Sequence, residues 1–358
     1  MQIPIQNIYY LLSYAWNKLE EAEAVAVSVD DKTQLIDLFA KVLINATKRL
    51  LKRGIDRNYV ERTAELAGIK GKIEIGETLK GRMWMQRKAS CSFDEFSADI
   101  ITNQILISTL YQLLRTQNLD RDLKEQIRNL LWMFPPIDKV RLSINLFKQV
   151  KIHRNNRFYE LIIKICQLIY ENSLPGESSG SWKFSDFTRD EQKMNQLFEG
   201  FVFNFFRLEQ QSYRVSREII KWQFDAHDEG ALNYLPQMRT DINLENEKRK
   251  IIIDAKYYQK TLSRYYNSEK VHSGNLYQLF SYLLNQEDGS SKKSETTGIL
   301  LYPTIDEDYT LQFQYKSHPI QIRTVNLNQP WKLISECLLQ IVESESRGIS
   351  LLNEGSES

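Results

Sequence analysis

Apolar residues in the first half of the chain mostly recur at helical spacing. In residues 5–19, for example, Ile8, Leu11 and Ala15 fall on one face, which predicts an amphipathic helix. Residues 59–93 instead alternate between polar and apolar side chains and are punctuated by glycine, which predicts strands joined by tight turns. Further helices are predicted at residues 34–53, 97–118, 120–133 and 158–171. The first half is therefore expected to be a mixed α+β domain.

The second half combines helical spacing with short apolar runs. Residues 251–253 are three consecutive isoleucines and predict a buried strand. Residues 240–244 predict a second strand, and the turn-prone residues 245–250 join the two as a hairpin. The remaining predicted elements are helices at 189–208 and 275–285 and a buried strand at 298–303. Helix, strands, helix and strand in this order predict an α/β core with mixed strand pairing.

A loop rich in serine, glycine and proline separates these two patterns at residues 172–181. Such a composition is typical of a linker. The 358 residues are also enough for two domains. We therefore predict an N-terminal domain at residues 1–170 and a C-terminal domain at residues 171–358.

A carboxylate–lysine cluster is predicted where the isoleucine strand ends. Side chains in a strand alternate faces, so Asp254 and Lys256 point the same way. The predicted hairpin brings Asp241 beside Asp254. Two carboxylates and a lysine form an oxygen-rich pocket suited to Mg²⁺, with a cation for phosphate. Because burying an unpaired carboxylate costs several kcal/mol, the cluster needs either a metal ion or an ion-pair network.

Three further polar side chains are candidates for the same site. Glu199 lies in a strongly apolar stretch of the predicted helix 189–208, where a carboxylate without a function is unexpected. Gln278 and Tyr282 stand at positions i and i+4 of a predicted helix and project from one face. The alternative for this pair is a polar helix face with no role.

Composition excludes several classes of protein. Hydrophobic residues make up 42% and charged residues 26%, as in ordinary globular proteins, and no apolar run approaches the ~20 residues that span a bilayer. The N-terminus lacks the basic and apolar regions of a signal peptide. Cys91, Cys166 and Cys337 are far apart and predict reduced core residues, with neither a zinc site nor a disulfide. His272 has no metal-ligand spacing to another His or Cys and is expected at the surface. We expect a cytoplasmic protein.

The order of the candidate residues resembles that of a known nuclease superfamily. An acid on a helix is followed by an Asp, by an Asp-x-Lys strand end, and by Gln-x-x-x-Tyr on a helix. The residues in this series are Glu199, Asp241, Asp254, Lys256, Gln278 and Tyr282. The series resembles the PD-(D/E)xK nucleases in their RecB-like form, with Thr240 where the name of the superfamily has proline. The resemblance implies a PD-(D/E)xK core in the C-terminal half.

The resemblance also implies a role for each residue in Mg²⁺-dependent phosphodiester hydrolysis. Asp241, Asp254 and Glu199 are the expected metal ligands. Lys256 is expected to hydrogen-bond the attacking water or to neutralise developing charge. Gln278 is a further expected catalytic residue, which positions Lys256 or the nucleophile. Tyr282 is an accessory residue, which is expected to hold the phosphate backbone.

A second resemblance covers nearly the whole chain. It begins with Pro4-Ile5-Gln6-Asn7-Ile8-Tyr9-Tyr10-Leu11-Leu12-Ser13-Tyr14-Ala15-Trp16. Further segments follow in order: Gly68-Ile69-Lys70-Gly71-Lys72-Ile73, Leu197-Phe198-Glu199, Thr240-Asp241-Ile242, Asp254-Ala255-Lys256-Tyr257-Tyr258 and Asn275-Leu276-Tyr277-Gln278-Leu279. Together they strongly resemble the McrC family, the nuclease subunit of McrBC modified-cytosine restriction systems.

The McrC resemblance implies a partner and a division of labour. McrC-like proteins associate with McrB, a GTP-hydrolysing AAA+ ring that recognises modified cytosine in double-stranded DNA. The N-terminal half docks into that ring and stimulates GTP hydrolysis, while the C-terminal half cuts DNA. This chain has no Gly-x-x-x-x-Gly-Lys-Ser/Thr motif, so GTP is expected on the partner. Its net charge of +1 agrees with DNA binding by the partner, since proteins that bind DNA without a partner usually carry an excess of basic residues.

Two other functions stay open from the sequence. The first is a RecB-like repair nuclease that works alone or with a helicase, although the N-terminal segment argues against it. The second is an adaptor that activates a partner NTPase while its own nuclease site is vestigial. The intact set of Asp241, Asp254 and Lys256 argues against this adaptor.

Overall fold

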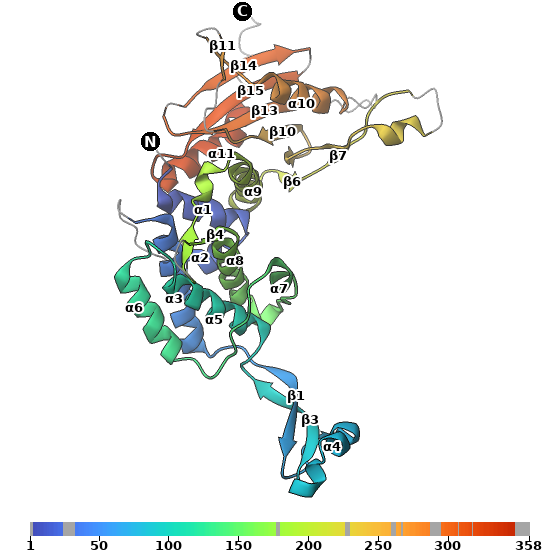
Figure 1. The fold of residues 1–358 in the computed structure, drawn as a ribbon. Coiled ribbons are helices and arrows are strands. Elements are labelled where there is room, and N and C mark those ends of the chain that lie inside the picture. The colour runs from blue at the N-terminus through green and yellow to red at the C-terminus, as the bar shows by residue number, and fades with distance from the viewer. Residues whose placement is uncertain are drawn as a thin grey trace, which may run out of the picture. The chain divides into compact units, whose positions relative to one another are not determined.

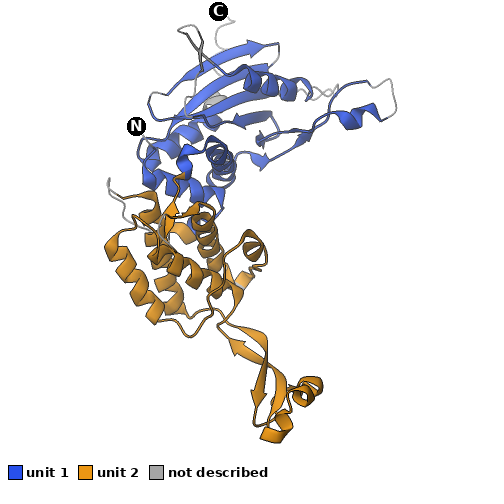
Figure 2. Cartoon of the chain, viewed as in Figure 1, with its two compact units in different colours: residues 1–20, 187–358 blue, residues 21–186 orange. Residues whose placement is uncertain are grey.

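The computed structural model describes residues 3–23, 33–176, 180–225, 230–258, 263–265, 268–286, 295–306, 308–316 and 318–347. The chain divides into two compact units, which Figure 2 shows in different colours. Unit 1 comprises residues 1–20 and 187–358, and unit 2 comprises residues 21–186. In the described ranges, no helix is both long and apolar enough to cross a membrane.

Helices form most of unit 2. Those predicted from the apolar spacing are all confirmed, although the helix predicted at 97–118 ends earlier, at Leu114. Leu38, Leu43, Ile105 and Ile162 are among the side chains that these helices bury completely or almost completely. The helices are α3 (Leu35–Arg53), α5 (Ile101–Leu114), α6 (Arg121–Trp132), α7 (Ile144–Lys148) and α8 (Phe158–Glu171), with the short α2 (Leu19–Glu23) before them (Figure 1).

Unit 2 also contains the strands predicted between residues 59 and 93. They are β1 (Asn58–Leu66), β2 (Lys72–Ile73) and β3 (Ala89–Ser97), which pair antiparallel in the order β1-β3-β2. The prediction missed two helical segments between these strands, α4 (Ile75–Lys80) and η1 (Met83–Gln86). Gly71 has φ +69°, and a Cβ at this position would collide with the carbonyl oxygen of Ser92. The glycine therefore allows the chain to pass close to β3.

The prediction that residues 172–181 form a linker is wrong for the part that pairs as a hairpin. β4 (Ser173–Pro175) pairs antiparallel with β5 (Trp182–Phe184) inside unit 2. The amide of Trp182 donates to the carbonyl of Arg115 (3.1 Å), and the amide of Gln117 donates to the carbonyl of Trp182 (2.7 Å). These long-range hydrogen bonds satisfy backbone groups that a linker would leave to water.

The compact units also differ from the predicted division at residue 170. The first helix, α1 (Ile5–Ala15), belongs to unit 1, where it packs on α9 (Glu191–Glu209). The side-chain amide (Nδ2) of Asn204 donates to the carbonyl of Ala15 (3.1 Å), and Gly200 lets the two helices approach closely there. Contacts across some 190 residues of sequence leave no local signal, so composition did not reveal this pairing.

A six-stranded mixed sheet lies at the centre of unit 1 (Figure 1). β10 runs parallel to β13 and β13 runs parallel to β15, whereas the remaining neighbours pair antiparallel, which confirms the predicted mixed pairing. In spatial order the strands are β14 (Thr310–Tyr315), β15 (His318–Asn326), β13 (Glu295–Thr304), β10 (Arg249–Ala255), β9 (Ile242–Glu245) and β6 (Arg214–Ser216).

Three helices pack against this sheet. Leu279 and Leu283 of α10 (Ser273–Leu284) bury themselves with Ile252 and Leu300 of the central strands. A Cβ on Gly298 would lie 2.9 Å from the Leu283 side chain, so this glycine lets α10 lie directly on β13. α9 packs against β6 and β10, and α11 (Trp331–Arg347) packs against β15. Short pairs complete the unit: β7 (Ile219–Ile220) with β8 (Met238–Arg239), and β11 (Ser263–Tyr265) with β12 (Ser268–Lys270).

Candidate active site

The β9–β10 hairpin forms as predicted and brings two carboxylates together. Ile242 at the start of β9 pairs with Ile253 of β10, so Asp241 lies just outside β9 and beside the end of β10. The amide of Ala255 donates to Asp241 Oδ2 (3.1 Å), which fixes this carboxylate against the strand that carries Asp254.

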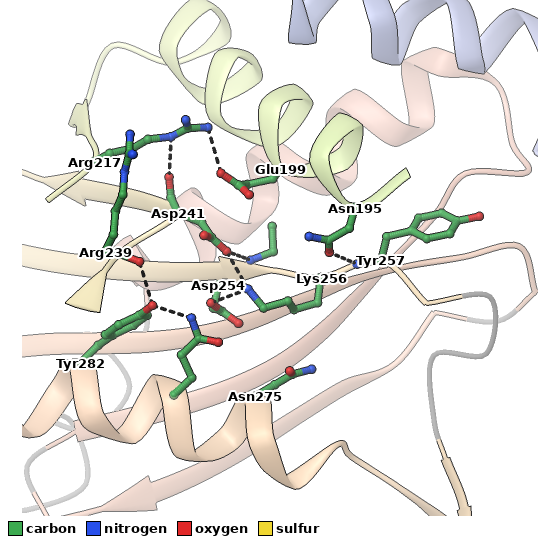
Figure 3. A network of polar contacts seen from close by, with 12 residues as sticks. Asn195, Glu199, Arg217, Arg239, Asp241, Asp254, Lys256, Tyr257, Asn275 and Tyr282 are labelled. Carbon is green, nitrogen blue, oxygen red and sulfur yellow. Dashed lines mark hydrogen bonds and ion pairs between the residues drawn. The ribbon is translucent and has the colours of Figure 1, made fainter. Parts of the chain in front are cut away.

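Lys256 joins the two carboxylates. Its Nζ lies 3.0 Å from Asp241 Oδ2 and 2.9 Å from Asp254 Oδ1 (Figure 3). Asp254 is completely buried, and its Oδ2 has no hydrogen-bond partner among the residues that the structure describes. A buried acceptor without a partner is costly in a folded protein, so this oxygen is available to a ligand that enters the site.

The pKa values of Asp254 and Lys256 are both raised, but for different reasons. The pKa of Asp254 is raised to about 7, chiefly by burial; the charge of Lys256 opposes this shift and that of Asp241 adds to it. Burial lowers the pKa of Lys256, but Asp254 and Asp241 outweigh this effect, and the pKa lies above its ordinary value. The lysine therefore stays a cation at neutral pH.

Glu199 approaches the cluster from α9 but is held by an arginine. Arg217 Nη2 lies 3.2 Å from Glu199 Oε1, and Arg217 Nε donates to the carbonyl oxygen of Asp241 (3.1 Å). The guanidinium lies over the ring of Phe203 at 4.5 Å. Burial raises the pKa of Glu199, and the nearby charge of Asp241 adds to this, whereas Arg217 opposes it. Arg217 thus connects two of the predicted metal ligands.

The three predicted metal ligands are near one another without forming a closed set. Within the described part of the chain, no group of three or more His, Cys, Asp and Glu residues is placed to hold a metal ion. Asp241 and Asp254 meet at Lys256, while Glu199 pairs with Arg217. The role of all three as ligands stays a prediction.

Gln278 and Tyr282 contact each other as their spacing predicts. Gln278 Nε2 donates to the Tyr282 hydroxyl (2.5 Å), which donates in turn to the carbonyl of Arg239 (2.8 Å). Tyr282 is buried, and burial raises its pKa. The tyrosine therefore supports the chain two residues before Asp241, and its expected contact with phosphate stays a prediction.

Sequence analysis missed several residues around the site. Asn195, one helical turn before Glu199, accepts a hydrogen bond from the amide of Tyr257 (2.8 Å) and so fixes the chain after Lys256. Its spacing from Glu199 was a signal that we did not use. The sequence gave no signal for Arg217, because this residue lies outside every motif. His272 was expected at the surface, but it is half-buried, with its ring stacked on Tyr258 at 4.2 Å and its Nε2 buried, so that expectation holds only in part.

Comparison with known proteins settles the family. Residues 6–303 match the family described as McrBC 5-methylcytosine restriction system component. The chain belongs to this family. It is 34% identical over 343 residues to the type IV methyl-directed restriction enzyme EcoKMcrBC of Escherichia coli strain K12, and the match covers 95% of this chain and 97% of that relative.

A solved structure supports the fold of this McrBC family member. The chain aligns with a half-complex from a tetradecameric assembly of Thermococcus gammatolerans McrB AAA+ hexamers with bound McrC. The TM-score is 0.57 at 16% identity, and the alignment covers 94% of this chain and 76% of that one. At this identity the likeness concerns the fold alone.

Proposed function

We propose that this chain is the Mg²⁺-dependent DNA-cleaving subunit of a GTP-driven restriction complex that acts on DNA with modified cytosine. The observation that carries the proposal is the junction of Asp241, Asp254 and Lys256 at adjacent strand ends, with a buried carboxylate oxygen left without a partner among the described residues. In this proposal the mixed sheet and its helices are a PD-(D/E)xK core. Cleavage of modified duplex DNA with the partner ring, GTP and Mg²⁺ is the test.

The donor set fits a hard divalent cation. Asp241 and Asp254 offer carboxylate oxygens, the ligands that Mg²⁺ prefers. Glu199 is the proposed third carboxylate, since it lies close enough to Asp241 for their charges to interact. When bound, the ion supplies a more acidic water and charge for the phosphate oxygens.

The side chains around the carboxylates have separate tasks in this proposal. Lys256 remains charged and donates hydrogen bonds toward the reacting water or the phosphate. Gln278 and Tyr282 hold the backbone at Arg239, and Asn195 holds it after Lys256. Each of these contacts fixes the position of a carboxylate or of the lysine before substrate arrives, which is what catalysis by positioning requires.

The proposed partner is an AAA+ GTPase ring that binds GTP. The T. gammatolerans assembly contains McrC bound to McrB AAA+ hexamers, and we extend that association to this chain. Unit 2 has a surface suited to a protein partner, because Trp84 and Met85 are 61% and 65% exposed at the end of its small sheet. Other exposed apolar side chains are Tyr59 and Phe96 on the same sheet, Ile69 between β1 and β2, and Leu79 on α4. In this proposal unit 2 docks to the ring and stimulates GTP hydrolysis.

The two competing functions have less support. A repair nuclease that acts alone does not account for a family match that begins at residue 6. An adaptor without cleavage does not account for a buried Asp254 that pairs with Lys256, since a vestigial site has no reason to keep a costly buried charge.

We expect Arg217→Ala to lower the cleavage rate about tenfold to a hundredfold. The substitution frees Glu199 and removes the hydrogen bond to the carbonyl of Asp241, so two carboxylates lose their fixed positions. Arg217→Lys keeps the charge, but one ammonium lacks the planar fork of the guanidinium and should restore only part of the rate. Single-turnover cleavage with the ring and GTP is the measurement. Arg214→Ala, at an exposed arginine of β6 three residues before Arg217, is the matched control, and equal rates for both Ala variants would contradict the role of Arg217.

We expect a fragment of residues 21–186 to bind the ring and raise its GTP hydrolysis without the rest of the chain. This fragment keeps unit 2 whole, including the β4–β5 hairpin. A fragment of residues 1–170 lacks the hairpin and exposes the face of α1 that packs on α9, so it should aggregate more readily. Replacing Trp84 and Met85 by serine should remove stimulation. Stimulation that needs the full chain would refute the assignment to unit 2.

A further inference from the structure

A β-bulge interrupts the strand pairing next to the candidate active site. Ser216 on β6 lies opposite Asn243 on β9, and Ile219 on β7 lies opposite Arg239 on β8. Between these two pairs the first segment has two residues, whereas the returning segment has three. One extra residue on one strand of an antiparallel pair bends that strand and changes the direction of a side chain, and bulges are frequent next to active sites.

Hydrogen bonds identify Asp241 as the extra residue. The amide of Thr240 donates to the carbonyl of Glu218 (3.0 Å), and the amide of Glu218 donates to the hydroxyl of Thr240 (3.0 Å), so these two residues stay paired. Ile242 on the other side already belongs to β9. The carbonyl of Asp241 accepts instead from the side chain of Arg217 (3.1 Å, Figure 3). Asp241 therefore lies outside both strands, and the bulge turns its carboxylate toward the candidate active site.

An ion pair with a buried lysine holds the residue opposite the bulge. Lys250, which is only 8% exposed, places its Nζ 2.6 Å from Glu218 Oε2 and also donates to Gln286 Oε1 just after α10 (2.9 Å). Glu218 Oε1 accepts from the hydroxyl of Ser216 (3.2 Å). Burial raises the pKa of Glu218, but the hydrogen bond and charge of Lys250 outweigh this effect, and the pKa lies below its ordinary value. The carboxylate is therefore ionised and is held by a side chain of β10.

Stability does not explain an ion pair in this position. Replacement of a buried ion pair by apolar side chains of similar volume often leaves stability unchanged or raises it, whereas the selection of one register is its best-supported use. A bulge that moved by one residue would turn the side chain of Asp241 to the other face of the sheet. Lys250 lies on β10, four residues before Asp254, so the pair ties the bulge to the strand that carries the second carboxylate of the site.

We propose that Lys250 and Glu218 are positioning residues that fix the bulge and thereby aim the Asp241 carboxylate at the proposed metal site and at Lys256. This inference rests on the proposed function. Glu218 acts through its two hydrogen bonds to Thr240, and Lys250 acts through Glu218. Neither side chain is expected to touch the DNA or the metal ion. The pair therefore controls how tightly the ion is held and how fast DNA is cut, but not how tightly DNA is bound.

A double replacement by apolar side chains separates positioning from stability. Lys250→Met with Glu218→Leu leaves no unpaired buried charge, so the full chain should fold with a thermal midpoint at or above that of the unsubstituted chain. Binding of Mg²⁺ alone to this variant, measured by calorimetry, should weaken about tenfold to a hundredfold. With the ring and GTP, kcat for cleavage of a modified duplex should fall about a hundredfold while KM for the duplex stays the same. Lys250→Met with Glu218→Gln keeps a polar side chain at position 218 and provides the test if the first variant does not fold.

Hydrogen exchange in the metal-free chain reports the position of the Asp241 carboxylate without any activity. The amide of Ala255 donates to Asp241 Oδ2, whereas the next amide, that of Lys256, donates to the carbonyl of Leu301 on β13. In the apolar double variant the Ala255 amide should exchange about fivefold faster or more, because it loses its acceptor. The Lys256 amide is the internal control and should exchange at an unchanged rate.

The outcomes separate this inference from the proposed function. The matched control is Lys332→Met with Glu336→Leu, at an exposed ion pair on α11, and it should leave Mg²⁺ binding, exchange and cleavage unchanged. A folded Lys250 and Glu218 variant that binds Mg²⁺ and cuts like the unsubstituted chain would overturn the inference and leave the function standing. Equal acceleration of both amides would indicate general loosening of β10 and would also overturn it. Faster exchange at Ala255 alone, without cleavage by the unsubstituted complex, would support the positioning role and count against the nuclease.

Discussion

Asp254→Ala is expected to lower DNA cleavage about a thousandfold or more while the chain stays folded and still binds the ring. The carboxylate is completely buried at the end of β10, and its loss removes one of the two carboxylates at the junction with Lys256, a proposed metal ligand. A catalytic metal is worth several kcal/mol, and each 1.36 kcal/mol corresponds to a factor of ten in rate. Cleavage of a modified duplex and stimulation of GTP hydrolysis are measured on the same preparation.

Two further variants keep this experiment specific. Asp254→Asn preserves shape and hydrogen-bonding capacity but not the charge, so it should also be inactive. Asp306→Asn replaces an exposed aspartate after β13 and should cut at the wild-type rate. A folded Asp254→Ala chain that retains Mg²⁺-dependent cleavage would sink the assignment. Loss of both cleavage and ring binding by Asp254→Ala would indicate misfolding. In that case cleavage by the Asp254→Asn variant decides whether the carboxylate is required.

The pH dependence of stability gives the Asp254 variants a readout without substrate. Burial raises the pKa of Asp254 to about 7, whereas an unfolded aspartate titrates near 4. Between about pH 4 and 7 the native state therefore holds a proton that the unfolded state has lost. The free energy of unfolding should fall as pH rises through this window, by about 1–4 kcal/mol from this group. Asp254→Asn should remove that part of the decline in metal-free protein, as measured by denaturant unfolding at both ends of the window.

Local patterns in the sequence predicted the central part of the site. Ile251–Ile253 required a buried strand, and the turn-prone residues before it required a hairpin, so the register followed from nearest neighbours. Strand alternation then placed Asp254 and Lys256 on one face, and helix spacing placed Gln278 beside Tyr282. In each case the contact joins residues that are close in sequence or in one short hairpin.

What the sequence did not predict depends on long-range contacts. Arg217 reaches the site because β6 pairs with β9 and α9 packs against β6, and both contacts join segments that are distant in sequence. The packing of α1 on α9 likewise joins segments some 190 residues apart in the sequence. Residues 172–181 looked like a linker because serine and glycine dominate this segment, while the pairing of Trp182 with Pro175 depends on strand partners that composition does not encode. The spacing of residues predicts contacts within a helix or a hairpin, whereas contacts between distant segments depend on tertiary packing.

The chain alone is expected to bind duplex DNA poorly at physiological salt and to cut little, even with Mg²⁺ present. Sequence-independent binding comes mainly from lysines and arginines that displace counterions, and the net charge here is only +1. Several of the cations near the site are already paired, since Lys256 is held by Asp241 and Asp254, and Lys250 by Glu218.

Addition of the GTPase ring and GTP should raise cutting of DNA with modified cytosines by a factor of a hundred or more, because the partner then supplies both grip and specificity. The measurement compares modified and unmodified duplexes with the chain alone, with the ring, and with the ring and a GTP analogue that is not hydrolysed. Strong dependence on salt for the chain alone, and weaker dependence for the complex, should accompany this difference. Efficient cutting of both duplexes by the chain alone would favour the repair nuclease. Full GTPase stimulation without cutting under any metal would favour the adaptor, because the docking surface of unit 2 then functions while the junction at Lys256 does not.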